Sequence, residues 1–205
     1  MKNKSIDINQ RIPLDTLYIA LESYLDSTYS NEYVLEQLRL EFEGENRLKK
    51  ALRIVNKIIQ KNPLNELLMD KKAEVKTAIK KKVDRDIILI ALLNSAFPFS
   101  FDVLQTFGKF FTVQELVNTE TIKKSISNVY GGNRATENAI YSVVPMFLEA
   151  GFFHRPKNGI YEWTGALSST NTITNEIYIE SFKVNNSITP SVDMHLRNPY
   201  FKFIT

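Results

Sequence analysis

Four basic residues recur four positions apart between residues 49 and 61, where they could neutralise a row of phosphates. They are Lys49, Arg53, Lys57 and Lys61. Residues at this spacing lie on one helix face, so the four side chains would form a stripe opposite an apolar face. Cations along such a surface neutralise successive nucleic-acid phosphates without sequence preference. Two other interpretations stay open, a solvated face and a face that docks on the acidic first 46 residues or on an acidic partner.

A second group of candidate contact residues lies in RATENAIYSVVPMFLEAGFFHRPKNGIYEW, residues 134–163. Its apolar residues recur at helical spacing and leave the opposite face polar. That polar face comprises Arg134, Asn138 and Tyr141. Gly151 should end the helix, and Phe152 and Phe153 should begin a short strand. The Asn-Gly of PKNG should then reverse the chain into a second short strand, because both residues tolerate positive φ. Arg155 and Lys157 would lie at or near the tip of this hairpin.

The order of these elements is typical of a winged helix-turn-helix, in which a helix reads the major groove and a hairpin touches the DNA backbone. Helix-helix-hairpin units also dock on other proteins. Pro145 would bend the reading helix or remove a hydrogen bond from it. Glu137 and Glu149 outnumber Arg134, its one basic residue. The pattern predicts a winged-helix-like unit and leaves DNA reading and protein docking both open.

No group of residues in this sequence is typical of an enzyme. The phosphate-loop, dinucleotide-binding, zinc-protease and nucleophile-elbow motifs are missing, and seven Gly leave little material for phosphate loops. With no Cys and two His, the chain offers no thiolate metal site and little imidazole chemistry. His154 would be a surface or half-packed residue of the hairpin, and His195 lies near Asp193 and Arg197 in a tail. We predict no catalytic residue, no metal and no cofactor.

Composition indicates a globular protein with one strongly basic segment. The chain has 205 residues, 43% of them apolar, and a formal net charge of +3. Residues 47–85 carry +9, residues 1–46 carry −5 and residues 86–205 carry −1. The basic segment continues past the stripe with Lys71, Lys72, Lys76, Lys80, Lys81, Lys82 and Arg85. The absence of Cys and of a signal-peptide pattern predicts a cytoplasmic protein, and the apolar run at residues 87–93 is too short to cross a membrane.

Helices must position both groups of candidate residues. Apolar residues three and four apart predict helices over residues 15–27, 31–43, 46–61, 64–83 and 86–97. Ser30 would cap the second of these helices, Asp84 or Asp86 the last, and Asn133 or Thr136 the helix that starts near residue 134. The aromatic-rich residues 98–111 should fill the core between helices. Two brief helices are expected over residues 112–118 and 121–130, and residues 176–184 alternate like a strand.

The predicted fold class is mainly α, a helical bundle with a C-terminal winged-helix-like unit that contains a short β-hairpin. Residues 1–110 would form a helical domain with the basic helices. Residues 111–166 would form the winged-helix-like unit. The composition shifts to Ser, Thr and Asn after Trp163, which is typical of a linker, so residues 167–205 are expected to be a polar linker and a C-terminal tail.

Four segments in this order resemble the BrxA family, the small helical component of bacteriophage-exclusion (BREX) defence systems. They are NRLKKALRIVNKII, DIILIALLNSAF, PFSFDVLQTFGKFF and NRATENAIYSVVPMFLEAGFF. The resemblance spans roughly residues 30–165, with residues 136–153 matching the closing helix of the family, and it does not extend to the tail after Thr164. It implies a mostly helical accessory protein that binds double-stranded DNA in a bacterial anti-phage operon, beside larger enzymes that modify or sense DNA.

We therefore predict a non-enzymatic protein that binds double-stranded DNA, with larger proteins of the same defence system as further partners. The predicted contact residues are Lys49, Arg53, Lys57, Lys61, Arg134, Asn138, Tyr141, Arg155 and Lys157. A protein-interaction adaptor within a multi-subunit complex is the first alternative. The second is a winged-helix transcription regulator, which would need a dimer and a palindromic site.

Overall fold

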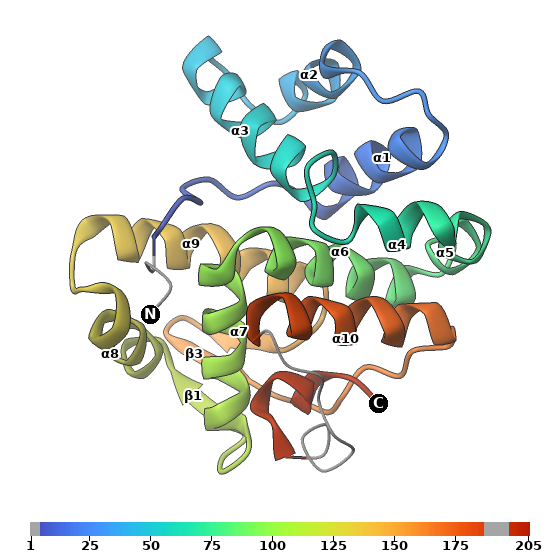
Figure 1. The fold of residues 1–205 in the computed structure, drawn as a ribbon. Coiled ribbons are helices and arrows are strands. Elements are labelled where there is room, and N and C mark those ends of the chain that lie inside the picture. Colours follow the sequence, from blue (N-terminus) through green and yellow to red (C-terminus); the bar gives the residue numbers. More distant parts are fainter. Residues whose placement is uncertain (1–4, 187–196) are drawn as a thin grey trace.

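The computed structural model describes residues 5–186 and 197–205, and its fold is mainly helical with one small antiparallel sheet (Figure 1). The helices are α1 (Leu14–Leu25), α2 (Asn31–Arg39), α3 (Glu45–Ile58), α4 (Asn65–Asp70), α5 (Lys72–Ala78), α6 (Lys82–Ala96), α7 (Pro98–Phe111), α8 (Thr119–Tyr130), α9 (Arg134–Glu149), α10 (Thr172–Asn186) and the 3-10 helix η1 (Pro199–Phe203). The strands are β1 (Leu116–Asn118), β2 (His154–Lys157) and β3 (Ile160–Glu162). The predicted mainly helical class is confirmed.

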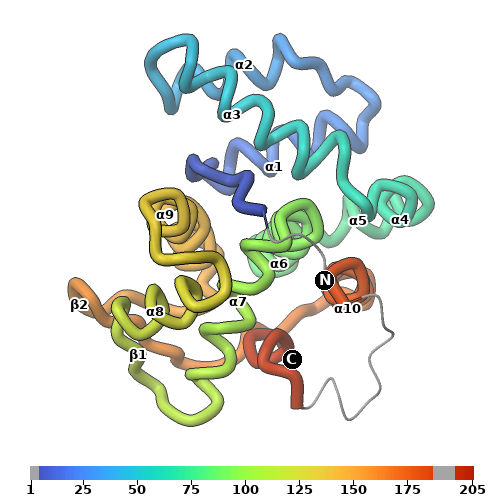
Figure 2. The backbone as a smooth tube through the Cα atoms, turned by 60° about the vertical axis from the view of Figure 1, so that its left-hand side comes forward, coloured from blue at the N-terminus to red at the C-terminus, as the bar shows by residue number. Residues whose placement is uncertain are grey.

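The N-terminal helices α1, α2 and α3 form a layer that lies over α6 (Figures 1 and 2). Ser30 caps α2 as predicted, because its side chain accepts a hydrogen bond from the N–H of Tyr33 at 3.1 Å. Helix α2 ends at Arg39, earlier than expected. Phe42 turns into the core after it, and α3 begins one residue past Gly44.

Two of the predicted helices differ from the structure between residues 64 and 97. The helix expected over residues 64–83 is two short helices, α4 and α5, which meet at Lys71, where ψ is 25°. Helix α6 begins at Lys82, so neither Asp84 nor Asp86 caps it and that prediction is wrong. Both carboxylates are buried inside α6 and bind other side chains, because three consecutive turns of this helix face protein on every side.

Residues 98–162 form a compact series of elements in the order α7, β1, α8, α9, β2, β3. The hairpin strand β3 lies in the middle of the sheet and pairs antiparallel with both β1 and β2. The brief helix expected over residues 112–118 is therefore wrong, since β1 occupies its second half. Within β1 only Val117 is buried, which is the alternation expected of a strand. Three residues are too few for this alternation to be recognised in a sequence.

The C-terminal residues pack against the centre of the molecule. The strand expected over residues 176–184 is wrong, because α10 runs through them and packs along α6. The buried Ile173 and Ile177 are four residues apart, as are the buried Tyr178 and Phe182, and this helical spacing outweighs the alternation seen in the shorter window. η1 packs on α7 so closely that a Cβ on Gly108 would lie 2.0 Å from the carbonyl oxygen of Pro199. The three-part division of the chain stays a prediction, but residues 167–205 contain more than a polar linker.

Aromatic side chains fill the space between α7, α9 and the C-terminal elements, as predicted for residues 98–111. Phe107 stacks on Phe153 with ring centroids 4.3 Å apart, and both rings are buried. Tyr178 of α10 stacks on Tyr200 of η1 at 4.4 Å. Burying one such ring stabilises a fold by about 2 kcal/mol, so this cluster fixes the position of α9 and of the hairpin that follows it.

Candidate functional site

Helix α9 presents the predicted polar face to solvent. Asn133 caps it, because the Asn133 side chain accepts hydrogen bonds from the N–H groups of Ala135 (2.9 Å) and Thr136 (3.0 Å). The helix continues through Pro145 to Glu149, so the proline does not end it. The exposed residues of the face are Arg134, Asn138 and Tyr141, with 56% of Tyr141 exposed.

The hairpin after α9 also presents its predicted residues to solvent. Arg155 and Lys157 are both exposed on β2. The turn closes at Gly159, whose φ of +80° is a conformation that glycine adopts without strain. Phe152 and Phe153 were expected to begin the first strand, but they are buried in the core and the strand begins at His154.

Tyr141 stands between two hollows, one on each side of α9. The first, which we call the hairpin hollow, lies between α8, α9 and the hairpin and measures about 290 Å³. Its polar and aromatic lining includes Thr119, Glu120, Lys123, Tyr141, Arg155 and Tyr161. Arg155 is thus brought together with Tyr141, although they are separated by the end of α9 and the start of β2.

The second hollow, which we call the N-terminal hollow, lies between α9 and the N-terminal layer and measures about 500 Å³. Its lining includes Gln10, Arg11, Glu41, Arg47, Asn138 and Tyr141. Arg47 is exposed, and its guanidinium lies 4.9 Å from the centroid of the Phe42 ring. The first turn of α3 therefore faces the polar side of α9, and Figure 2 shows both helices on one side of the molecule.

The predicted stripe on α3 is only partly free. Lys57 forms an ion pair with Asp7, and its ammonium lies 4.4 Å from the centroid of Phe97. Arg53 is exposed but lies 3.4 Å from the backbone carbonyl of Asp7. Within the described residues, no side-chain hydrogen bond or ion pair holds Lys49 or Lys61, and both are exposed. Lys61 lies beyond the end of α3.

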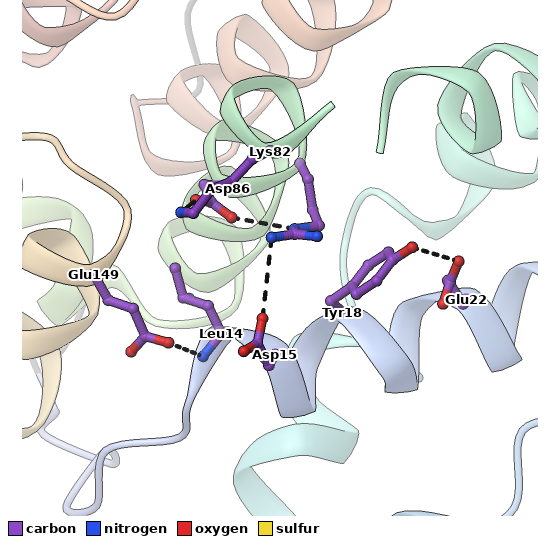
Figure 3. A network of polar contacts seen from close by, with 8 residues as sticks. Leu14, Asp15, Tyr18, Glu22, Lys82, Asp86 and Glu149 are labelled. Carbon is purple, nitrogen blue, oxygen red and sulfur yellow. Dashed lines mark hydrogen bonds and ion pairs between the residues drawn. The ribbon is translucent and has the colours of Figure 1, made fainter. Parts of the chain in front are cut away.

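The rest of the basic segment is largely paired inside the protein. Lys76 binds Asp26, the residue that follows α1. The Arg85 guanidinium lies 4.0 Å from Asp15 and 3.3 Å from Asp86. Lys82 also binds Asp86, as Figure 3 shows. The pairs Lys57–Asp7, Lys76–Asp26 and Arg85–Asp15 join the basic segment to the acidic first 46 residues. Docking on those residues therefore accounts for part of the basic charge.

Glu149, which counted against DNA contact in the sequence, has a structural role. Its carboxylate accepts the N–H of Leu14 at 2.9 Å and pairs with Arg11 at 2.6 Å. Figure 3 shows it reaching from the end of α9 to the first residue of α1. A carboxylate at a helix N-terminus is stabilising, because that end carries partial positive charge. This contact fixes α9 against the N-terminal layer.

Sequence reasoning missed Lys123, a cation that lines the hairpin hollow. Its ammonium lies 3.0 Å from Glu120 and 5.1 Å from the centroid of Tyr141, and its side chain is 18% exposed. Contact with the Tyr141 hydroxyl and with Glu120 raises the pKa of Lys123 above its ordinary value, so it stays charged at neutral pH. In the sequence, Lys123 and Lys124 differ only in their position around the helix relative to the buried Ile122 and Ile126. That position was the signal that could have identified Lys123.

The described residues give no further indication of catalytic chemistry. His154 is exposed on β2, and His195 lies outside the described residues. Within residues 5–186 and 197–205, no group of three or more His, Cys, Asp and Glu side chains is placed to hold a metal ion. Over the same residues, no helix is long and apolar enough to cross a membrane.

Comparison with known proteins adds no relative: neither a family model, nor a curated protein, nor a solved structure matches this chain.

Proposed function

We propose that this chain is a non-enzymatic accessory protein that binds double-stranded DNA through a winged-helix unit made of α7 to β3. The observation that carries the proposal is the order of the elements: helix, strand, two helices and a hairpin, with β3 between β1 and β2. This order is typical of a winged helix-turn-helix. α7 would be the first helix of the unit, which then begins near residue 98 instead of residue 111.

In this proposal α9 enters the major groove and the hairpin lies on the backbone. Asn138 and Tyr141 would approach the base edges, since amide and hydroxyl groups can bond to them. Arg134, Arg155 and Lys157 would contact phosphates and fix the orientation of the helix. Lys49 and Arg53 of α3, and Lys61 just beyond its end, would add backbone affinity, with Lys57 available only if it leaves Asp7.

We further propose that the protein works in a bacterial anti-phage defence system beside larger proteins. Support for this part comes from the four segments that resemble the BrxA family. A helical protein with no catalytic motif is suited to such an accessory role, in which a partner performs the chemistry.

The experiment that tests DNA binding is fluorescence anisotropy of a labelled duplex of about 30 base pairs over a series of salt concentrations. Wild-type protein should bind, and log affinity should fall linearly with log salt because phosphate contacts release counterions. The double variant Arg134→Glu, Lys157→Glu should bind more weakly, with a salt slope lowered by about two. Lys80→Glu is the control, since it follows α5, on the far side of the molecule from α8 (Figure 1). Absence of binding at low salt would reject the proposal.

A protein-interaction adaptor is the second candidate, and two observations favour it. Residues 98–162 hold six Lys and Arg against six Asp and Glu, so this unit carries no net positive charge. Val113 and Leu116 are 79% and 53% exposed beside and on the edge strand β1, an apolar surface that a partner could cover. Co-purification of a partner that survives nuclease treatment, together with no duplex binding, would establish the adaptor.

A further inference from the structure

We propose that the hairpin hollow binds one phosphate group, held by Lys123, Arg155 and the hydroxyl of Thr119. The inference deepens the proposed function, on which it rests, because the phosphate would be a phosphodiester of the DNA backbone beside α9. It assigns a binding role to Lys123 and Thr119, which the sequence did not single out.

Lys123 is a cation held in place within this hollow. Its side chain is 18% exposed, and the Tyr141 ring lies 5.1 Å from its ammonium. An aromatic face attracts an ammonium without neutralising it, so the charge remains available to an anion. Glu120, 3.0 Å away, is 76% exposed. Because an exposed ion pair is weakly stabilised, Glu120 can turn to solvent when a phosphate enters.

Arg155 lines the same hollow from the hairpin strand β2. Its guanidinium lies 5.9 Å from the centroid of Tyr161 and donates to the side chain of Asn158 across the hairpin turn. No Asp or Glu pairs with Arg155 among the described residues. An arginine and a lysine that line one hollow supply the donors that a phosphate oxygen binds most strongly.

The hydroxyl of Thr119 is the third component of the site. Its Oγ1 is buried, yet no hydrogen-bond partner for it is present in the described residues. Buried polar atoms are almost always paired, and Thr119 lines the hollow, so we infer that its unpaired hydroxyl turns to a phosphate oxygen that enters there. Thr119 thereby adds a neutral donor to the two cations.

The volume of the hollow suits a single phosphate group better than a whole small-molecule ligand. Its volume of about 290 Å³ is at the lower limit of small-molecule sites, which run from about 300 to 1,000 Å³. Val144, Pro145 and Leu148 form an apolar wall on the α9 side. Such a wall excludes water and strengthens charge-assisted hydrogen bonds to a phosphate at the mouth.

Two neighbouring lysines give a matched test with the duplex. Lys123→Gln should weaken duplex binding about tenfold at low salt and lower the salt slope by about one, because one charged phosphate contact is lost. Lys124→Gln removes the same charge from the next residue, which is exposed outside the hollow, and should leave slope and affinity close to wild type. Thr119→Val keeps the shape of the side chain, removes the hydroxyl, and should weaken binding without changing the slope. Unfolding curves would verify that each variant is folded.

A second arm uses inorganic phosphate as the probe. Adding phosphate at constant ionic strength should shift the backbone amide resonances of residues 119–123 in wild-type protein, and Lys123→Gln should abolish the shift. Duplex binding that depends on Lys123 with no phosphate shift would assign the site to the DNA backbone alone. A phosphate shift without duplex binding would support the hollow and reject the proposed function. Equal slopes for Lys123→Gln and Lys124→Gln with no phosphate shift would overturn the hollow and leave the proposed function intact.

Discussion

Asp84 illustrates how one buried carboxylate joins distant parts of this chain. It is fully buried in α6, and it accepts hydrogen bonds from the N–H of Thr170 at 3.0 Å, from the Thr170 hydroxyl and from Asn171 at 2.7 Å. These donors directly precede α10. A carboxylate at this position is favourable because the helix N-terminus is partially positive. Asp84 therefore holds α10 in the groove beside α6.

We expect Asp84→Asn to lower the free energy of unfolding by about 1–3 kcal/mol. The amide preserves the shape but removes the charge and turns one acceptor into a donor that faces other donors. Urea unfolding at neutral pH measures the change. Asp70→Asn, at an exposed site at the end of α4, is the matched control and should change stability by less than about 0.5 kcal/mol. Equal stability of the two variants would contradict the role given to Asp84.

The same carboxylate should make stability depend on pH. Burial alone would raise the pKa of Asp84, but hydrogen bonds from Thr170 and Asn171 outweigh it and hold the pKa below the ordinary value. The unfolded chain then binds the proton first, so the contribution is complete above about pH 5 and is lost as pH falls through the folded pKa. The stability difference between wild type and Asp84→Asn should narrow below about pH 4. A difference that is unchanged between pH 3 and pH 7 would refute this.

At the scale of elements, two polar residues of helix α9 have different roles. Asn133 stabilises the start of the helix, and Asn138 is a candidate contact residue on its exposed face. We expect Asn133→Ala to cost about 1 kcal/mol of unfolding free energy, because two N–H groups at the start of α9 lose their acceptor. Asn138→Ala, on the exposed face, should leave stability unchanged or slightly raised, since Ala favours helix. The effect on duplex affinity should be the reverse of the effect on stability, so that Asn138→Ala lowers the affinity more than Asn133→Ala does. Urea unfolding and anisotropy on both proteins test this contrast, and a loss of stability at Asn138 would contradict it.

The elements that the sequence predicted well are those with local signals. Ser30 and Asn133 were recognisable as caps, and the Asn-Gly turn specified the hairpin, because a few neighbouring residues determine each feature. β1 and α10 were missed for two different reasons. β1 is a three-residue strand defined by its pairing with β3, and α10 has a helical period that a nine-residue window presents as alternation. Lys123 needed the fold itself, since its contact with Tyr141 joins two helices.

At the scale of the whole molecule, the basic segment serves folding before it serves any partner. Lys57, Lys76 and Arg85 are directed to Asp7, Asp26 and Asp15 of the acidic first 46 residues. A sequence cannot separate such internal pairs from a free binding face, because both have the same composition. The charge that remains for any anionic partner is therefore smaller than the +9 of residues 47–85.

This division of charge gives the last prediction. Lys49 and Lys61 are exposed and carry no ion pair within the described residues, so reversing both to Glu should weaken binding to all duplex sequences alike and lower the salt slope by about two. Stability should change little, because no internal contact is broken. Lys57→Glu should behave differently, losing stability through repulsion from Asp7 as well as any DNA contact. Anisotropy and urea unfolding distinguish the two classes, with Lys72→Glu, Lys80→Glu, on and just after α5, as a control of equal charge. If the Lys49 and Lys61 variant binds as tightly as this control, α3 has no part in DNA binding and its free cations are only solvated surface.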